Sequence, residues 1–242
     1  MKQAIGILLL HGFTGFPETV NGLVPLLEEA QLPYRMPCLR GHWTRAEDLI
    51  GVTAADWVED AEKALDDLLN DCDKAVIVAL SMGGLIALQV AIDRPQDLAG
   101  VVSVAAALRY RDPLVALTPL LSRLFKFWPM PVPKVETAYG SPKNYSTFPT
   151  KTFASMLAFS KHIESSLPQV TTPIRILHSH ADQVISPQSA QIIHDRVSSA
   201  EKQLFWFART GHEMMMDWEK DRVFERIMEF ISQRQASALS NT

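Results

Sequence analysis

Three side chains suited to nucleophilic catalysis each follow an apolar segment of this 242-residue sequence. Ser81 follows residues 75–80, Asp182 comes soon after residues 174–178, and His212 comes soon after residues 203–207. A serine hydroxyl is a weak nucleophile until a base removes its proton, and that base needs an acidic partner to orient it. The residue types and their order therefore predict Ser81 as nucleophile, Asp182 as acid and His212 as base.

The residues around Ser81 indicate a sharp turn between a strand and a helix. An apolar run ends at Leu80, and Met82, Gly83 and Gly84 follow the serine. Small neighbours two positions either side of a serine let strand and helix approach closely, and the usual pattern is Gly-x-Ser-x-Gly. Ala79 replaces the first glycine here, a change of one methyl group that the turn can tolerate. The alternative is that Ser81 only caps a helix.

Other residues compete with Asp182 and His212 for their roles. Asp195 lies within a predicted helix, Asp217 follows His212 too closely to lie beneath it, and Glu213 is its direct neighbour. Taken alone, Asp182 could be a turn residue and His212 an exposed loop residue. The coincidence of all three residues in the expected order, each after a predicted strand, favours the triad. The remaining histidines fit the role of base less well and show no metal-ligand spacing, so no metal or cofactor is expected: His11, His42, His162, His178, His180 and His194.

Two backbone amides are predicted to stabilise negative charge on the substrate oxygen. The Met82 amide lies directly after the nucleophile, at the start of a predicted helix. The second donor is expected from the loop after the first strand, where Gly12 and Gly15 bracket Phe13. We assign the Phe13 amide to this role; the alternative is an ordinary turn in which glycine only relieves the backbone.

Short apolar runs alternate with amphipathic stretches, which predicts an α/β fold with a mostly parallel sheet and helices on both faces. Several of the runs are apolar throughout, as strands covered on both faces must be. The predicted strands are 5–10, 34–36, 75–80, 98–104, 174–178 and 203–207. The predicted helices are 20–30, one that begins after Ala54, 82–93, 189–197 and 221–231.

The stretch from residue 106 to 170 interrupts this alternation, so we predict a cap inserted into a core formed by residues 1–105 and 171–242. Seven of the fifteen prolines lie between Pro113 and Pro149. A long excursion within a compact domain is typical of a lid. Its apolar residues could line an acyl pocket, pack the cap onto the core, or touch a lipid surface: Leu114, Leu117, Leu120, Leu121, Leu124, Phe125, Phe127 and Trp128.

Composition narrows the classes of partner. A net charge of −4 and a pI of about 6.0 give no electrostatic reason to bind nucleic acid or an anionic membrane. No window reaches the length of a membrane span, and the apolar run at residues 4–10 is too short for a secretory signal. Cys38 and Cys72 show no pairing pattern and are expected to be free, buried thiols. Free thiols indicate a cytoplasmic protein. The expected partner is a small-molecule substrate.

Several motifs together resemble the bacterial carboxylesterases of the monoacylglycerol-lipase-like group of α/β-hydrolases. The resemblance covers most of residues 5–218 and only weakly the cap. The motifs are Leu-Leu-Leu-His-Gly-Phe-Thr-Gly at 8–15, Leu-Arg-Gly-His at 39–42, Asp-Trp at 56–57, Ser-Met-Gly-Gly at 81–84, Ala-Asp at 181–182 and Thr-Gly-His at 210–212.

The resemblance implies an α/β-hydrolase fold with a small cap and hydrolysis of short- to medium-chain acyl esters, including monoacylglycerols, through an acyl-serine intermediate. It gives Ser81, Asp182 and His212 the triad roles and Phe13 and Met82 the oxyanion roles. A close alternative is the same triad acting on thioester, amide or carbon–carbon bonds, or transferring an acyl group. A more distant one is a ligand-binding protein without catalysis, since one fold hosts many functions.

Overall fold

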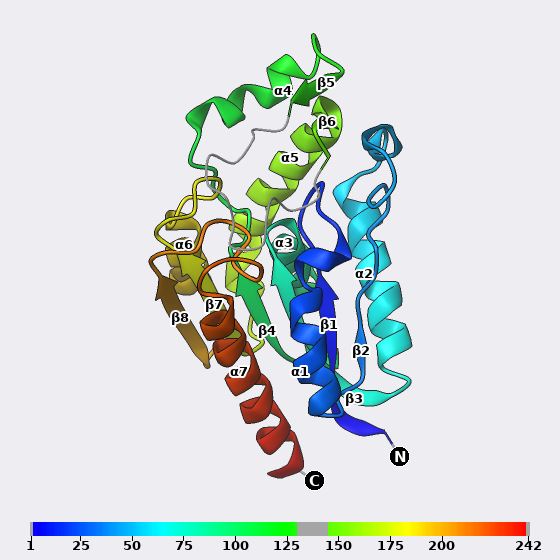
Figure 1. Cartoon of the computed structure of the whole chain (residues 1–242), viewed down its shortest axis with the longest axis vertical. Helices are drawn as coiled ribbons and strands as arrows, with labels where there is room; N and C mark the ends of the chain where they lie inside the picture. Colours follow the sequence, from blue (N-terminus) through cyan, green and yellow to red (C-terminus); the bar gives the residue numbers. More distant parts are fainter. Residues whose placement is uncertain (1, 130–144, 241–242) are drawn as a thin grey trace.

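The computed structural model describes residues 2–129 and 145–240. Six strands form one sheet in the order β2-β1-β3-β4-β7-β8, and every neighbouring pair is parallel. Figure 1 shows helices on both faces of this sheet, as the α/β prediction requires. The strands are β1 (Gln3–Leu10), β2 (Tyr34–Arg35), β3 (Cys72–Leu80), β4 (Leu98–Val104), β7 (Ile174–Ser179) and β8 (Lys202–Phe207).

The central strands are buried along almost their whole length because helices cover both faces. The last six residues of β1 and of β3 are all inaccessible to solvent. The pairing of Leu10 with Ala79 places the ends of these two strands side by side. The loop that leaves β1 therefore begins beside Ser81, the residue that follows β3.

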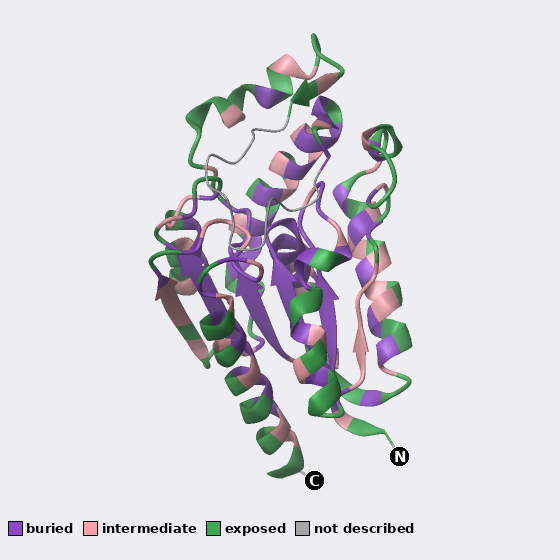
Figure 2. Ribbon diagram, in the orientation of Figure 1, coloured by how far each residue is buried: buried purple, intermediate pink, exposed green. Residues whose placement is uncertain are grey.

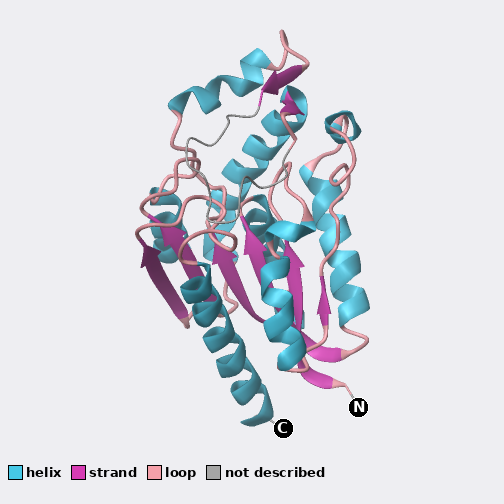
Figure 3. Cartoon of the chain, in the orientation of Figure 1, coloured by secondary structure: helices cyan, strands magenta, loops and turns pink. Residues whose placement is uncertain are grey.

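Two layers of helices complete the core, as Figure 3 also shows. The apolar faces of α1 and α7 pack on one side of the sheet, and those of α2, α3 and α6 pack on the other. Helix α3 has the predicted limits, whereas the predicted helix 20–30 is split into a short 3-10 turn and α1. The helices are α1 (Val24–Glu29), α2 (Ala54–Leu68), α3 (Met82–Asp93), α6 (Gln188–Arg196) and α7 (Lys220–Ser240).

Helix α7 extends nine residues beyond the predicted end at Ile231. Its buried positions follow helical spacing from Val223 to Arg234, so the apolar face continues past that end. Arg234 is buried although charged, because its guanidinium lies over the ring of Phe230 and pairs with Glu201. A buried arginine interrupts the apolar pattern in the sequence, and this explains why the prediction was too short.

The described residues between β4 and β7 add no strand to the large sheet. They contain α4 (Thr118–Leu121), a small antiparallel pair formed by β5 (Phe127–Pro129) and β6 (Thr147–Pro149), and α5 (Thr150–Ser166). Figure 1 shows α4 and β5 at the top of the molecule, beyond the carboxyl ends of the sheet strands. Residues 130–144 of the predicted cap lie outside the described residues.

Most of the apolar side chains at residues 114–128 do not pack onto the core as the packing interpretation requires, whereas Phe148 and Phe153, later in the same segment, are buried. Figure 2 shows that α4 and its flanks are largely exposed. Thr118 is the only buried residue of α4. That interpretation is therefore wrong for the six side chains that are exposed: Leu114, Leu117, Leu120, Leu124, Phe125 and Trp128.

The two thiols have different surroundings. Both are free, but only Cys72 is buried, where burial raises the pKa of its thiol to about 11. Cys38 is exposed, so its predicted burial was wrong. It follows the short strand β2, which lies at the edge of the described sheet and pairs with β1 on one side. Among the described residues, no helix combines the length and apolar character needed to cross a bilayer.

Candidate active site

Ser81 lies on a strained turn between β3 and α3. Its backbone has φ 56° and ψ −115°, in a region where side chains other than glycine are unfavourable. The Ser81 N–H donates to Val104 O at 2.9 Å, and the Gly84 N–H donates to Ser81 O at 3.0 Å. The Ser81 side chain does not cap α3. The strain therefore serves to present the hydroxyl above the sheet rather than to start a helix.

Close backbone contacts explain the small residues around this turn. A Cβ atom at Gly83 would lie 2.6 Å from Leu10 O, so no larger residue fits without moving β1. A Cβ atom at Gly12 would lie 3.1 Å from Ser81 Cβ and 3.6 Å from its Oγ. The loop after β1 thus lies directly against the serine. Ala79 is completely buried in β3, and its methyl group is accommodated there.

The structure brings the three predicted triad residues together in a continuous hydrogen-bonded chain. His212 Nε2 lies 2.9 Å from Ser81 Oγ, and His212 Nδ1 lies 2.9 Å from Asp182 Oδ2. Asp182 is fully buried, Ser81 is nearly so, and the His212 side chain retains limited exposure. With the Nδ1 proton donated to the carboxylate, Nε2 is free to accept the serine proton.

Charge coupling within this chain shifts both titrating groups. Burial lowers the pKa of His212, but the charge and hydrogen bond of Asp182 outweigh it and raise that pKa to about 9. Burial raises the pKa of Asp182, and the charge and hydrogen bond of His212 reverse this and leave it below its usual value. An ionised carboxylate therefore faces the imidazole and stabilises its protonated form.

Asp182 is both the acid partner of His212 and a turn residue, and it uses a different carboxylate oxygen for each role. Its Oδ1 accepts the Val184 N–H at 2.8 Å and the Ile185 N–H at 2.9 Å, while Oδ2 faces His212. The turn fixes the carboxylate plane and leaves one oxygen for the histidine. The competing Asp195 is exposed on α6, where it contacts His194 and Gln191.

Two further carboxylates hold the loop that carries His212, and sequence reasoning missed their role. Glu219 Oε2 accepts three consecutive backbone N–H groups, from Ala208 at 3.1 Å, Arg209 at 2.7 Å and Thr210 at 3.1 Å. Asp217 Oδ2 accepts the Gly211 N–H at 2.5 Å. Four consecutive amides before the histidine are thus fixed by buried acids. Two acidic residues shortly after Gly-His were the available signal.

The Phe13 amide lies in the loop that contacts Ser81, and His11 fixes its orientation. The Leu39 N–H donates to His11 Nε2 at 3.1 Å, so Nδ1 carries the proton and donates to Gly12 O at 2.9 Å. Gly12 O and the Phe13 N–H belong to the same planar peptide and point in opposite directions. Burial, followed by the nearby His42, lowers the pKa of His11 to about 3, which keeps the imidazole neutral.

The other predicted donor, Met82, is the first residue of α3 and is fully buried. N–H groups in the first turn of a helix have no acceptor within that helix. The Met82 amide therefore lies immediately after the nucleophile at the end of the helix that favours negative charge. Met82 and Phe13 approach Ser81 from two different elements, α3 and the loop after β1.

A cluster of aromatic rings lies beside the Phe13 loop. The Phe13 ring is 5.9 Å from Trp57 of α2, 5.9 Å from Phe148 of β6 and 5.7 Å from Phe153 of α5, measured between centroids. The rings meet mostly edge to face or tilted, as aromatic pairs prefer. The cluster joins the segment between β4 and β7 to the core at the edge of the candidate site. Sequence reasoning did not single out these rings.

A second histidine lies behind the acid. His178 is buried at the end of β7, and its Nε2 is 3.8 Å from Asp182 Oδ2, too far for a hydrogen bond. Burial is the largest influence on the pKa of His178, which lies below its usual value, so its neutral form is favoured beside the carboxylate. Of these two histidines, only His212 links Asp182 to Ser81 by hydrogen bonds.

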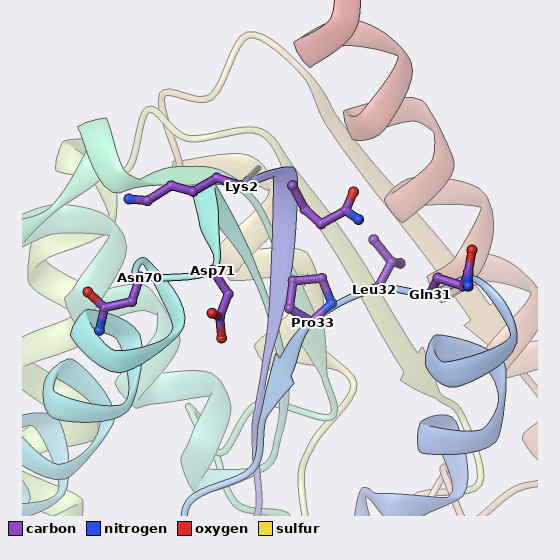
Figure 4. A pocket seen from close by; sticks show the side chains of 7 residues that line it. Lys2, Gln31, Leu32, Pro33, Asn70 and Asp71 are labelled. Carbon is purple, nitrogen blue, oxygen red and sulfur yellow. The ribbon is translucent and has the colours of Figure 1, made fainter.

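A pocket at the opposite end of the sheet is unrelated to these residues. Lys2, Gln31, Asn70 and Asp71 surround it near the amino ends of β1 and β3 (Figure 4). Ser81, by contrast, follows the carboxyl end of β3. Within residues 2–129 and 145–240, no group of three or more His, Cys, Asp or Glu side chains is arranged to hold a metal ion.

Comparison with known sequences adds three findings. The profile of the family described as "Serine aminopeptidase, S33" matches residues 6–219. The thermostable monoacylglycerol lipase of Bacillus sp. (strain H-257) is 28% identical over 236 residues, covering 94% of this chain and 90% of that protein. The carboxylesterase of Bacillus subtilis (strain 168) is 25% identical over 226 residues, covering 93% and 91%.

A solved structure from work on the metagenome-derived lipolytic enzymes LipS and LipT has the same fold. It superposes with a TM-score of 0.90 at 28% identity and covers 96% of this chain and 95% of that one. The six-stranded parallel sheet is therefore the α/β-hydrolase sheet that the sequence motifs predict.

Proposed function

The chain belongs to the hydrolase family described as serine aminopeptidase, S33, and we propose that it hydrolyses carboxylic esters through an acyl-serine intermediate. The observation that carries the proposal is the hydrogen-bonded chain from Ser81 Oγ through His212 to Asp182 Oδ2, with both links at 2.9 Å. Its relatives include a monoacylglycerol lipase and a carboxylesterase, which supports ester substrates. We extend the proposal to short- and medium-chain acyl esters, including monoacylglycerols.

In the first half-reaction, Ser81 Oγ attacks the ester carbonyl carbon while His212 Nε2 accepts the hydroxyl proton. The carbonyl oxygen becomes an oxyanion, which the Phe13 and Met82 amides stabilise by hydrogen bonds. The imidazolium then donates its proton to the leaving alkoxide, and the bond between carbonyl carbon and alcohol oxygen breaks. An alcohol leaves and the acyl group remains on Ser81. Asp182 stays ionised and stabilises the imidazolium throughout.

In the second half-reaction, water replaces the alcohol. His212 Nε2 accepts a proton from a water molecule whose oxygen attacks the acyl carbonyl carbon. The tetrahedral oxyanion uses the same two amides. Collapse breaks the bond to Ser81 Oγ, which recovers its proton from His212, and the carboxylic acid leaves. The chain of three side chains is then restored.

We also propose that residues 106–170 act as a cap over this site, with residues 1–105 and 171–242 as the core. Helix α5 and β6 supply Phe153 and Phe148 to the aromatic cluster beside Phe13. Both rings are buried and pack against Phe13, next to the proposed oxyanion donor. An acyl chain or a glycerol backbone in this region would be shielded from water on the side of α5.

A second candidate is amide hydrolysis, which the description of the family as aminopeptidases favours. Both reactions use the same triad, so the leaving group must distinguish them. The test compares the butyryl ester of p-nitrophenol with the butyryl anilide and a butyryl thioester, and adds monoacylglycerols of graded chain length. We expect the ester and the monoacylglycerols to be cleaved with the highest kcat/KM. Preference for the anilide would replace this proposal with a peptidase function.

The same panel tests the acyl site. Each buried methylene contributes about 0.8 kcal/mol, so kcat/KM should rise up to about fourfold per added methylene until the site is full. Beyond that length the rise should stop. Phe153→Leu, which reduces the aromatic cluster, should flatten the rise for longer chains and leave acetate esters almost unchanged. An equal loss for every chain length would mean that Phe153 only packs the cap against the core.

A further inference from the structure

The outer part of the segment between β4 and β7 exposes several large apolar side chains within a short stretch of chain. We call residues 114–128 the cap tip; it comprises most of a 3-10 helix, α4, the turn that follows and the first two residues of β5. Single exposed apolar side chains are common, but a contiguous group marks an interaction surface. The exposed apolar residues of the cap tip are Leu114, Leu117, Leu120, Leu124, Phe125 and Trp128.

The same part of the chain is basic within an acidic protein. The net charge of the whole chain is −4, yet residues 113–163 contain six Lys or Arg and a single Asp or Glu. Among them Arg123, Lys126 and Lys151 are exposed. Within the described part of the chain, none of these three has a carboxylate within 4 Å. Arg40, an exposed residue outside the cap, by contrast pairs with Asp56, Glu59 and Asp60.

Two of these apolar side chains and the three basic ones line one groove of about 580 Å³. It lies between the turn at residues 50–53 and the cap tip, where β6 ends and α5 begins. Ile50, Leu124 and Phe125 supply apolar surface, and Arg123, Lys126 and Lys151 supply positive charge. An occupant with complementary chemistry has hydrocarbon chains and negatively charged headgroups.

We propose that the cap tip docks on a negatively charged lipid–water interface. The exposed leucines and aromatic rings would enter the boundary between headgroups and acyl chains, and the three cations would contact lipid phosphates. Each Lys or Arg close to an anionic surface strengthens partitioning about fivefold. Figure 1 places α4 and β5 beyond the carboxyl ends of the strands, the end of the sheet at which Ser81 lies. Docking would thus turn the candidate site toward the lipid.

The test measures sedimentation of the full chain with vesicles. One set contains phosphatidylcholine alone, and the other contains about a quarter phosphatidylglycerol. At about 50 mM NaCl we expect at least roughly tenfold stronger partitioning to the anionic vesicles. Raising the salt to about 500 mM should remove most of this difference, because salt screens the headgroup charge. Equal binding to both vesicle types, or binding to neither, would overturn the proposal.

Matched variants locate the surface. Lys126→Glu combined with Lys151→Glu should lower partitioning to anionic vesicles at least roughly tenfold. Lys74→Glu combined with Lys161→Glu makes the same change in charge at exposed lysines outside the groove and should retain most of the binding. Leu124→Ser should weaken binding, whereas Leu239→Ser at the end of α7 should not; the two leucines are 75% and 67% exposed. Equal losses in test and control variants would overturn the proposal.

Hydrolysis of p-nitrophenyl butyrate in solution separates this proposal from the catalytic one. All four variants lie away from Ser81, His212 and the two amides, so each should retain wild-type activity and melting temperature. Loss of vesicle binding with retained activity supports docking at the cap tip. If the cap-tip variants instead change the oligomeric state without affecting vesicle binding, a second copy of the chain covers this surface and the proposal is wrong. The vesicle measurement does not depend on catalysis. If the protein shows no esterase activity, the proposed function fails but the docking proposal is still tested.

Discussion

At the scale of single residues, the site depends on side chains whose two polar atoms bind two different partners. Asp182 uses one carboxylate oxygen for the turn to Val184 and Ile185 and the other for His212. His11 uses one ring nitrogen as acceptor and the other as donor, which orients the peptide that carries the Phe13 amide. Each such pair of hydrogen bonds fixes the orientation of a reacting group before the substrate binds.

The first prediction concerns the nucleophile. A fluorophosphonate probe should label Ser81, because its hydroxyl is hydrogen-bonded to a histidine that accepts its proton. Ser81→Ala and His212→Ala should each lower kcat by at least about 10⁴-fold, and the double variant should be scarcely worse. Peptide mapping and single-turnover kinetics measure both effects. An adduct at another serine, or near-normal activity of Ser81→Ala, would contradict the assignment.

The second prediction concerns pH. Protonated His212 cannot accept the serine proton, so kcat/KM should be low below the pKa of His212 and rise above it. Although burial lowers that pKa, Asp182 raises it to about 9 overall, so the midpoint should lie above the ordinary value of 6.5. Asp182→Asn removes the raising charge while burial remains, so the midpoint should move down. A wild-type midpoint below 6.5, with spontaneous hydrolysis subtracted, would contradict the coupling.

At the scale of elements, the ends of strands and the loops that follow them place the reacting groups. The turn after β3 carries Ser81, the turn after β7 carries Asp182, and the loop after β8 carries His212. Parallel strands end at one edge of the sheet, and this brings together residues 30 and 131 positions apart in sequence. The loop after β8 contains no regular element before His212, so Glu219 and Asp217 replace the missing backbone partners.

The third prediction tests this loop. Glu219→Ala leaves three backbone N–H groups without their acceptor and should cost about 1–3 kcal/mol of unfolding free energy. It should also lower kcat more than it raises KM, because His212 loses its fixed position. Glu225→Ala removes an exposed acid of α7, the helix that begins directly after Glu219, and is the matched control. Denaturant unfolding and steady-state kinetics give the two readouts; an unchanged kcat would mean that Glu219 only stabilises the fold.

The pKa of Glu219 also predicts how the free energy of unfolding changes at acid pH. Burial raises the pKa of Glu219, but the amides of Arg209, Thr210 and Ala208 and the charge of Arg222 lower it overall. A carboxyl whose pKa is depressed by folding stabilises the protein above its unfolded value of about 4.5. That contribution is lost as the pH falls through the folded pKa. Glu219→Gln should therefore reduce the difference in stability between about pH 7 and about pH 3.

At the scale of the whole molecule, buried residues and charges are distributed unevenly along the chain. The central strands and α3 are almost completely inaccessible to solvent, whereas α4 contributes one buried residue. The excess of positive charge in residues 113–163 is opposite to the net charge of the chain. The sheet therefore provides the fixed framework for the triad, and the cap tip provides an exposed surface with different chemistry.

The fourth prediction follows from this uneven burial. Backbone amides of α4 should exchange hydrogen with solvent at least about 100-fold faster than those of β3, because few buried contacts oppose local opening. Exchange followed by mass spectrometry of peptides from residues 114–128 and 72–80 measures the difference. Anionic vesicles should slow exchange in the first peptide alone. Equal protection of both peptides in solution would show that the cap tip is held as firmly as the core.

The sequence by itself determined the sheet and the order of the candidate triad. Parallel strands covered on both faces appear as continuous apolar runs, and β4 and α3 have the predicted limits. The small residues around Ser81 indicated the strained turn, since a Cβ atom at Gly83 would meet the backbone of β1. Such local signals are reliable because they depend on residues adjacent in the chain or on the alternation of the main chain itself.

Only the tertiary structure decided which partner each polar or apolar group meets. Asp217 was weighed as a rival acid and instead binds the Gly211 amide, and His11 was set aside although it orients the Phe13 peptide. The leucines of the cap tip fit a buried or an exposed position equally well by composition, and the structure exposes them. These outcomes depend on contacts between segments far apart in sequence, where hydrogen-bond geometry and the surface left uncovered by neighbouring elements determine the result.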